Sequence, residues 1–556
     1  MSTPTLNSPG AGGSPDSQRT VTGSYPPTTH KTVLPDWKPI KVEDALPPSE
    51  RTFKPRRTRK ARFLRICFGI LVFLGLAALA AYFIWRHFDK KLKEPQSPSQ
   101  PSEPAGWTGL DPAKVQPLDP NFRYRDLSVP FQYGVEPIRG VNVGGWLITE
   151  KFLNPSLYAK FADSRGEWPA DEWHLSLAMG SKLSEEFDSH YSTYFVEDDF
   201  ARIAQMGLNH VRIPFAHWVF PNTPVNGEPF YYGGSWKWLI QAVEWCRKYG
   251  LRVALDLHTA VGSQSGYDHT GRNGTIEFLN GTNGQSNADR TRQIAGQIAT
   301  HFFGGNRTSP NGISYDHVTI FSTMNEPFVA TINFDGLYNW YSDTYTTIRN
   351  QTSLATSTSP QIKATLANFT KYPTPTWPSV VINDGFSGEY LWFDLFPASR
   401  FNNLWMDFHK YISLNKGTDA QSKSDKFGTP CLKWRADFLG SRDRLGPAYM
   451  GEWSASWSAT AESNFTKMTE GDKRDLAIWT QIQMDVAENS GIGWFFWNLK
   501  TEKSQYAHWD YYVGVNEGWI PRNFSAPKRF TCPPVGSSLA WCEGGACYDA
   551  EGNLRV

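Results

Sequence analysis

Two glutamates stand in contexts that suit acid–base chemistry. Glu326 lies in the segment Ser322-Thr-Met-Asn-Glu-Pro327, which directly follows the β-type run 318–321. Glu452 follows a second short apolar run at 448–450. Each carboxylate is therefore expected at the C-terminal end of a strand, where a barrel of alternating strands and helices holds its catalytic groups. Two such carboxylates can cleave a glycosidic bond, one as the proton donor and the other as the nucleophile. Most glutamates are solvated loop acids, but the Asn-Glu-Pro context and the strand-end position favour the catalytic interpretation.

Eight short apolar runs alternate with helical stretches from about residue 121 onward. They are Ile138–Val143, Leu208–Ile213, Val253–Leu257, Val318–Phe321, Val380–Ile382, Leu404–Phe408, Ala448–Met450 and Ile492–Phe496. Strand–helix alternation predicts an α/β fold with a parallel sheet, and eight units predict a (β/α)₈ TIM barrel with long loops. A doubly wound open sheet is the alternative. The chain has neither of the glycine-rich phosphate loops that would give such a sheet a nucleotide-binding role.

Polar and aromatic residues follow the predicted strands and are expected to converge at one end of the barrel. They are Arg212, His258, Asn325, His409, Tyr411 and Trp497. Any one of them taken alone is more often structural, but together they indicate a site. Arg212 and Tyr411 are suitable hydrogen-bond donors for Glu452. Asn325 can reach a sugar 2-hydroxyl, where hydrogen bonds strengthen in the transition state, and Trp497 can floor the sugar ring.

The N-terminal part of the chain predicts a membrane anchor. Residues 1–65 read as a disordered cytoplasmic tail that ends in a basic cluster, and residues 66–85 contain no charge over 20 positions. That length can cross a bilayer as a signal-anchor helix, with the basic cluster holding the N-terminus inside. Residues 86–120 then form a Pro/Ser-rich stalk before the barrel domain at 121–556. The alternatives are a buried soluble helix for 66–85 and a nucleic-acid patch or localisation signal for the basic residues.

Glycosylation sites and cysteines agree with an external barrel. All of the N-x-[ST] sequons follow the predicted span: Asn273, Asn280, Asn306, Asn350, Asn368, Asn464 and Asn523. Five cysteines also follow it, so at least one is free or pairs between molecules. We expect Cys246 to be the unpaired one, buried in the helical stretch 236–248. The cysteines at 532, 542 and 547 predict a disulfide clamp on the C-terminal tail rather than a zinc site. The net charge of +1 argues against nucleic acid as a partner.

The motifs of this barrel resemble those of the fungal exo-β-1,3-glucanases of glycoside hydrolase family 5, from about residue 129 to the C-terminus. The motifs that carry the resemblance are Arg139-Gly-Val-Asn-Val-Gly-Gly-Trp146, Val211-Arg-Ile-Pro214, Asp256-Leu-His258, Gly262-Ser-Gln-Ser-Gly-Tyr-Asp268, Met324-Asn-Glu-Pro327 and Gly451-Glu-Trp453. The family is retaining, and the resemblance implies that Glu326 is the acid/base and Glu452 the nucleophile. It also implies that Glu150 and Asp268 bind the terminal glucose and close the pocket. The tail and anchor resemble the membrane-bound type within the family.

Two positions depart from the family pattern at the pocket entrance, where two phenylalanines are common. Tyr267 matches the first position and Leu414 the second. These two replacements put the linkage preference and the binding of sugars in the outer subsites in question. We expect a retaining exo-β-1,3-glucosidase that acts on cell-wall β-glucan without a cofactor or metal, as a monomeric catalytic domain outside the cell membrane. The alternatives are a glucosidase or transglucosylase on β-1,6-glucan or glucosylated lipid, and a wall-glucan anchor that binds without turnover.

Overall fold

The structure of the protein is a computed structural model. The structure describes residues 117–555, with the exception of 223–226, 305–307, 353–377, 415–416, 418–419, 458–467, 503 and 550–551. The chain divides into two units, residues 1–100 and 101–556, and the described residues all belong to the second. The predicted tail at 1–65, the predicted span at 66–85 and most of the stalk at 86–120 lie outside the described residues. Within the described part of the chain, no helix combines the length and the apolar character needed to cross a bilayer.

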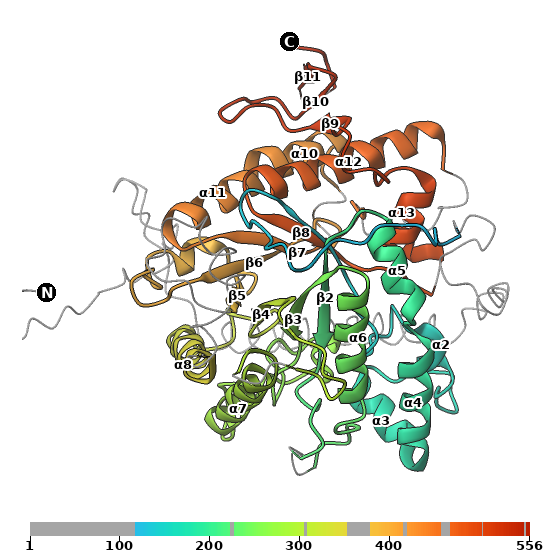
Figure 1. Ribbon diagram of the computed structural model, residues 1–556, viewed down its shortest axis with the longest axis vertical. Coiled ribbons are helices and arrows are strands. Elements are labelled where there is room, and N and C mark those ends of the chain that lie inside the picture. The colour runs from blue at the N-terminus through green and yellow to red at the C-terminus, as the bar shows by residue number, and fades with distance from the viewer. Residues whose placement is uncertain are drawn as a thin grey trace, which may run out of the picture. The chain divides into compact units, whose positions relative to one another are not determined.

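A closed barrel of parallel strands, joined in the order β1 to β8, forms the centre of the second unit (Figure 1). The strands are β1 Ile138–Asn142, β2 His210–Phe215, β3 Arg252–Leu257, β4 Val318–Ser322, β5 Ser379–Asn383, β6 Leu404–Lys410, β7 Ala448–Trp453 and β8 Gly493–Phe496. Pairing of Arg139 in β1 with Trp494 in β8 closes the ring. The eight predicted runs all form barrel strands, so the predicted (β/α)₈ architecture is confirmed and the open-sheet alternative is excluded.

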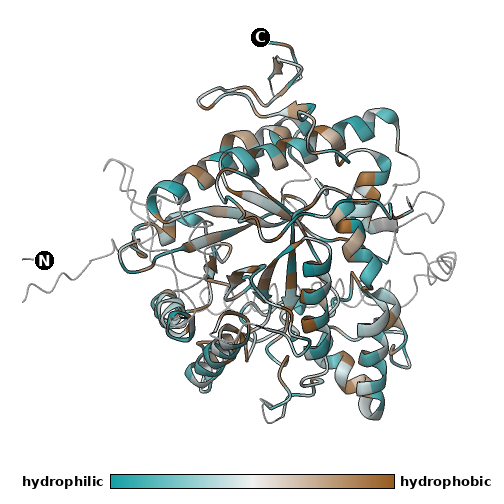
Figure 2. Cartoon of the chain, viewed as in Figure 1, coloured by the Kyte–Doolittle hydropathy of each residue, from teal (hydrophilic) through white to brown (hydrophobic). Residues whose placement is uncertain are grey.

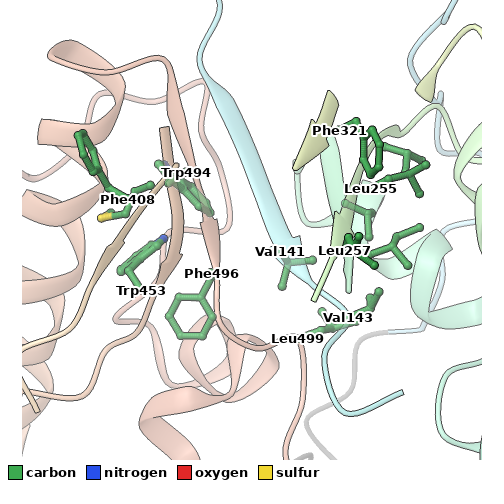
Figure 3. Packing of buried hydrophobic residues seen from close by; sticks show 14 of the residues in the cluster. Val141, Val143, Leu255, Leu257, Phe321, Phe408, Trp453, Trp494, Phe496 and Leu499 are labelled. Atoms are coloured by element: carbon green, nitrogen blue, oxygen red, sulfur yellow. The ribbon is translucent and has the colours of Figure 1, made fainter. Parts of the chain in front are cut away.

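The pleat of the strands decides which side chains enter the barrel, because successive residues point to opposite faces. In β3, Val253, Leu255 and Leu257 belong to the large apolar cluster that the strands share with the helices. Figure 3 shows Leu255 and Leu257 in this cluster. The intervening Asp256 is fully buried and contacts Arg212 of β2. Polar groups such as Asp256 therefore lie on the opposite face of the strands from this cluster, a face that also carries a second apolar cluster including Ala254, Trp405 and Phe495.

Helices cover the outside of the barrel (Figure 1). Those before β4 are α2 Pro155–Ala159, α3 Glu172–Met179, α4 Leu183–Thr193, α5 Glu197–Gln205, α6 Trp236–Lys248 and α7 Gly284–Phe303. Those after β4 are α8 Phe334–Thr352, α10 Lys423–Thr429, α11 Arg435–Arg444, α12 Glu470–Asn489 and α13 Tyr511–Glu517. In α6 the buried residues include Leu239, Val243 and Cys246, which recur at helical spacing on one face. Figure 2 accordingly shows hydrophilic and hydrophobic residues along the same helices.

One irregularity in the sheet lies next to the predicted site. The β6–β7 register shifts between Phe408 and His409, and beyond the shift His409 pairs with Glu452. A local shift of this kind re-aims side chains near functional sites. Here it brings an imidazole opposite the predicted nucleophile.

The C-terminal segment is fastened by disulfides. Strands β9 Phe530–Thr531, β10 Trp541–Glu543 and β11 Ala546–Tyr548 form a small antiparallel sheet. Cys431 bonds to Cys532 and Cys542 bonds to Cys547, which confirms the predicted clamp. Cys246 is free and buried, as predicted.

The described sequons differ in accessibility. Asn273, Asn350 and Asn523 are exposed, and Asn280 is half-buried. The sequons at Asn306, Asn368 and Asn464 lie outside the described residues. Occupancy of all seven stays a prediction.

Candidate active site

A cavity of about 880 Å³ opens where the barrel strands end. The predicted site residues that line it are Glu150, His258, Tyr267, Asp268, Asn325, Glu326, His409, Tyr411, Glu452 and Trp497. The remaining predicted residue, Arg212, is fully buried behind the cavity wall and contacts Glu452. The fold therefore brings the whole predicted set together from strands that are far apart in the chain.

Glu452 is held by donors on both carboxylate oxygens. Arg212 donates from Nη1 to Oε1 at 2.9 Å, and the Tyr411 hydroxyl donates to Oε2 at 3.1 Å. Both contacts are the ones expected from the residue types. Because donors and positive charge stabilise a carboxylate, this arrangement suits a group that must stay ionised.

Arg212 is itself fixed by a ring of acceptors. Its Nη1 also donates to Asn142 Oδ1 at 2.9 Å, and its Nη2 donates to Asn325 Oδ1 at 2.8 Å. Asp256 Oδ1 lies 3.0 Å from the same Nη2. This buried cation therefore sets the position of Glu452 relative to the β1, β3 and β4 strand ends. Because the Asn325 oxygen is occupied by Arg212, its amide nitrogen is the atom that can donate to a ligand.

Glu326 lies across the cavity with an imidazole at each oxygen. His409 Nδ1 lies 2.5 Å from Oε1, and His269 Nε2 lies 3.3 Å from Oε2. The backbone of Glu326 has a φ of 40°, which lies in the left-handed region that residues other than glycine rarely adopt. Backbone strain of this kind concentrates at functional sites.

The charges of this cluster are strongly coupled. Burial opposes a charge on Glu326, but His269 and His409 outweigh it and lower the pKa of Glu326 to about 2. Burial raises the pKa of Glu452 to about 7 against the pull of His409 and Arg212. The pKa of His409 is raised well above its usual range, because Glu452, Asp407 and Glu326 outweigh the effect of burial. With these pKa values Glu326 ionises more readily than Glu452. This order is the reverse of what the predicted roles require.

The hydrogen-bond partners favour the predicted roles. Glu452 faces Arg212, a cation at every accessible pH. Glu326 instead faces the imidazole of His409, whose Nδ1 lies 2.5 Å from Oε1 and can exchange a proton with it. A permanent cation suits the predicted nucleophile, and an imidazole suits the predicted proton donor.

The inner end of the cavity is polar on one side and aromatic on the other. Glu150 Oε1 is buried and has no hydrogen-bond partner among the described residues. The pKa of Glu150 is raised well above its usual range by burial and then by Asp268, Glu452 and Glu326. The Trp497 ring stacks on His258 at 5.6 Å between centroids. A sugar ring entering here would meet acceptors and an aromatic face.

Several lining residues were not identified from the sequence. They are Phe152, His269, Phe386, Ser413, Tyr506 and Trp509. His269 directly follows Asp268, so the same motif could have indicated it. Phe386 follows β5 and meets Tyr267 at the entrance, with ring centroids 6.4 Å apart. Leu414 also lines the cavity and is 69% exposed.

The trio Glu326, His409 and Glu452 also offers ligand types that metals take, with one atom from each within 4.8 Å of the others. The 2.5 Å between His409 Nδ1 and Glu326 Oε1 is a direct hydrogen bond. Two ligands of one zinc ion lie roughly 3 Å apart or more. The trio in this arrangement fits proton transfer better than metal binding.

Comparisons with known proteins agree with this geometry. Residues 178–503 match the family model "Cellulase (glycosyl hydrolase family 5)". Curated proteins described as "Probable glucan 1,3-beta-glucosidase D" are 30% identical in Aspergillus clavatus and 31% identical in Aspergillus niger. Both alignments cover 76% of this chain and 51% of the relative, so the chain spans about half the length of these proteins.

Solved structures share the fold at lower identity. The "Crystal structure of AoRut" and the rutinosidase from Aspergillus niger each give a TM-score of 0.54 at 19% identity and cover 70% of this chain. These alignments cover 98% and 99% of the respective structures. At this identity the likeness concerns the fold alone.

Proposed function

The chain belongs to glycosyl hydrolase family 5 and is a glycoside hydrolase; from this premise we propose that it is a retaining, exo-acting β-1,3-glucosidase that releases glucose from non-reducing ends of cell-wall β-glucan. The observation that carries the proposal is the pairing of Glu452, held by Arg212 and Tyr411, with Glu326 across one cavity. The names of the relatives in Aspergillus support the β-1,3 linkage.

The separation of the two carboxylates supports retention. A carboxylate oxygen of Glu326 and one of Glu452 lie within 4.8 Å of each other. Retaining pairs stand about 5–5.5 Å apart, whereas inverting pairs leave room for a water at roughly 6.5–9.5 Å. An oxygen–oxygen distance below 4.8 Å is closer to the retaining spacing than to the inverting one.

In the first step, Glu452 attacks the anomeric carbon while Glu326 protonates the departing glycosidic oxygen. The transfer leaves Glu326 ionised, and His409 Nδ1, 2.5 Å from Oε1, can donate a hydrogen bond to that carboxylate until it regains a proton. In the second step, Glu326 takes a proton from water, and the water oxygen displaces Glu452 from the sugar. Arg212 stabilises the charge that returns to Glu452.

The polar inner end of the cavity supports exo action. Glu150 and Asp268 offer acceptors to the hydroxyls of a terminal sugar, and Trp497 offers the face on which its ring can lie. Such a dead end would admit one glucose and place the next sugar toward Tyr267 at the entrance.

Laminarin digestion tests the proposal. The purified barrel domain should release glucose as its first product, and proton NMR of that glucose should show the β-anomer before mutarotation. A ladder of oligosaccharides would indicate endo cleavage or transfer, and α-glucose would exclude retention. E452Q serves as the inactive control.

A second candidate is glucoside hydrolysis or transfer on β-1,6-glucan or a glucosylated lipid. The exposed Phe386 and Leu414 at the entrance favour it, because an apolar rim can hold an apolar aglycone. Parallel assays on laminaribiose, gentiobiose and a glucosylated sterol would rank the substrates. The highest kcat/KM on the sterol glucoside would favour this candidate.

We also propose that residues 66–85 anchor the enzyme with its barrel outside the cell. The uncharged run and the basic residues before it support this orientation, as do the exposed sequons at Asn273, Asn350 and Asn523. Removal of N-glycans from isolated membranes should lower the apparent mass of the full chain. An unchanged mass, together with protease access only from the cytoplasmic side, would exclude the orientation.

A further inference from the structure

His269 contacts the predicted proton donor on the side opposite His409. It lies in the 3₁₀ turn Asp268–Thr270 that follows β3, and its ring lines the cavity. Its Nε2 lies 3.3 Å from Glu326 Oε2 and 3.1 Å from the Ser265 hydroxyl. Its side chain is 15% exposed, so it reaches both the buried carboxylate and the cavity space.

The two catalytic carboxylates consequently have different kinds of partner. Glu452 contacts a permanent cation, Arg212, and a hydroxyl that stays neutral. Glu326 contacts imidazoles, His409 at Oε1 and His269 at Oε2. The predicted acid/base is therefore held by imidazoles, whereas the predicted nucleophile is held by a guanidinium and a hydroxyl.

We propose that His269 is a second positioning residue for Glu326. Its Nε2 holds Oε2 by a direct contact and so favours the carboxylate form, which accepts a proton from water in the second step. This inference rests on the proposed function for the role of Glu326, but the contact itself does not.

The surroundings of His269 allow this role. The titratable groups that face it are Glu326 from the end of β4 and His258 from the end of β3, whose ring centroid lies 5.8 Å away. Asp268 precedes it in the same turn, and the Tyr267 ring centroid lies 5.9 Å away. His409 contacts Glu326 at the other carboxylate oxygen, Oε1. Among these groups, Glu326 is the acid in direct contact with Nε2.

The charge of His269 has a defined consequence. Against the opposing effect of burial, His269 is the first of the groups that lower the pKa of Glu326. Removing it should therefore leave Glu326 protonated to higher pH. The basic limb of kcat/KM, where the donor loses its proton, should move in the same direction.

Two substitutions separate charge from hydrogen bonding. H269Q keeps a donor near the position of Nε2, toward Glu326 and Ser265, but carries no charge, and H269A removes both. The matched control is H174Q, because His174 lies in α3 with a half-exposed ring beside Asp171. Infrared titration of the Glu326 carboxyl band, identified by subtracting the spectrum of E326Q, measures its ionisation without any turnover.

In both H269Q and H269A, the titration midpoint of Glu326 and the basic limb on laminaribiose should rise by about one pH unit or more. H269A should in addition lose roughly 10-fold or more in kcat because Oε2 is no longer held, whereas H269Q should recover most of it. Unchanged infrared midpoints in both variants would overturn the inference. If the wild-type enzyme hydrolysed no β-glucoside, the proposed function would fail while the infrared result still decided the role of His269.

Discussion

Arg212 donates from Nη1 to Glu452 Oε1 across 2.9 Å, although the two residues lie 240 positions apart in the chain. Arg212 is fully buried and also faces Asp256 and Asp407, so one guanidinium serves three carboxylates inside the barrel. This single cation links the stability of the barrel interior to the charge state of the predicted nucleophile.

Replacement of Arg212 should therefore impair both folding and catalysis. R212M leaves buried carboxylates without a counter-charge, which should lower the free energy of unfolding by about 3–5 kcal/mol and kcat/KM by roughly 10²–10³-fold. R212K should recover part of the stability but little of the activity, because an ammonium cannot reproduce the planar fork. Urea unfolding and laminarin kinetics measure the two effects. R165M, at a 71% exposed surface arginine, is the control and should change neither by much.

Substitution of the two glutamates should separate their roles. E326Q should lose roughly 10²–10⁴-fold on laminarin, because the leaving group is no longer protonated, yet still release the aglycone of an activated aryl glucoside in a burst. E452Q should fail on both substrates, because no glycosyl intermediate forms. Stopped-flow absorbance measures the burst. A burst from E452Q and none from E326Q would reverse the assignment.

A substitution at the inner end of the cavity should affect turnover of every substrate. A substitution at the entrance should affect turnover mainly of long substrates. D268A removes an acceptor for the terminal sugar, and an unpaired sugar hydroxyl costs roughly 1–3 kcal/mol. It should therefore weaken turnover of laminarin and of an aryl monoglucoside alike. Y267A should weaken turnover of laminarin more than of the monoglucoside. The control is Y390A, at a 65% exposed tyrosine. Unchanged kinetics in D268A would refute the closed pocket.

His508 should make the domain less stable in acid. Burial lowers the pKa of His508 from 6.5 to about 4, and neither ring nitrogen has a hydrogen-bond partner among the described residues. Between pH 6.5 and 4 the unfolded chain binds a proton here that the folded domain excludes, so stability falls as the pH decreases through this window. H508F should reduce that loss by up to about 3 kcal/mol, measured by urea unfolding at both pH values. H174N is the control, and an equal loss in H508F and wild type would contradict the prediction.

The two disulfides should differ in their contribution to stability. Cys431 and Cys532 are separated by 101 positions, whereas Cys542 and Cys547 are separated by 5. Loop-closure entropy predicts about 4.7 kcal/mol for a loop of 100 residues and roughly 2 kcal/mol for the short one. The C431S/C532S variant should therefore melt at lower temperature than C542S/C547S, as calorimetry can show. The reverse order would mean that the C-terminal sheet depends on its own disulfide more than on its attachment to the barrel.

The sequence by itself determined the barrel and most of the residues at its mouth. Short apolar runs such as 253–257 have the strand period, and each is followed by a polar or aromatic residue, such as His258 or Trp497. Parallel strands that alternate with helices point their C-terminal ends the same way. Local patterns therefore sufficed to place these residues at one end of the fold.

Only the tertiary structure decided how those residues pair. The contacts of Arg212 with Asn142 and Asn325, the imidazole at each oxygen of Glu326 and the bond from Cys431 to Cys532 all join segments that are distant in sequence. The motif around Asp268 could have indicated His269 as a lining residue, but only the folded chain shows that its ring contacts Glu326. The charge balance of Glu326 and Glu452 was likewise beyond the sequence, because a pKa depends on burial and on the distances to neighbouring charges, and both are set only when the barrel closes.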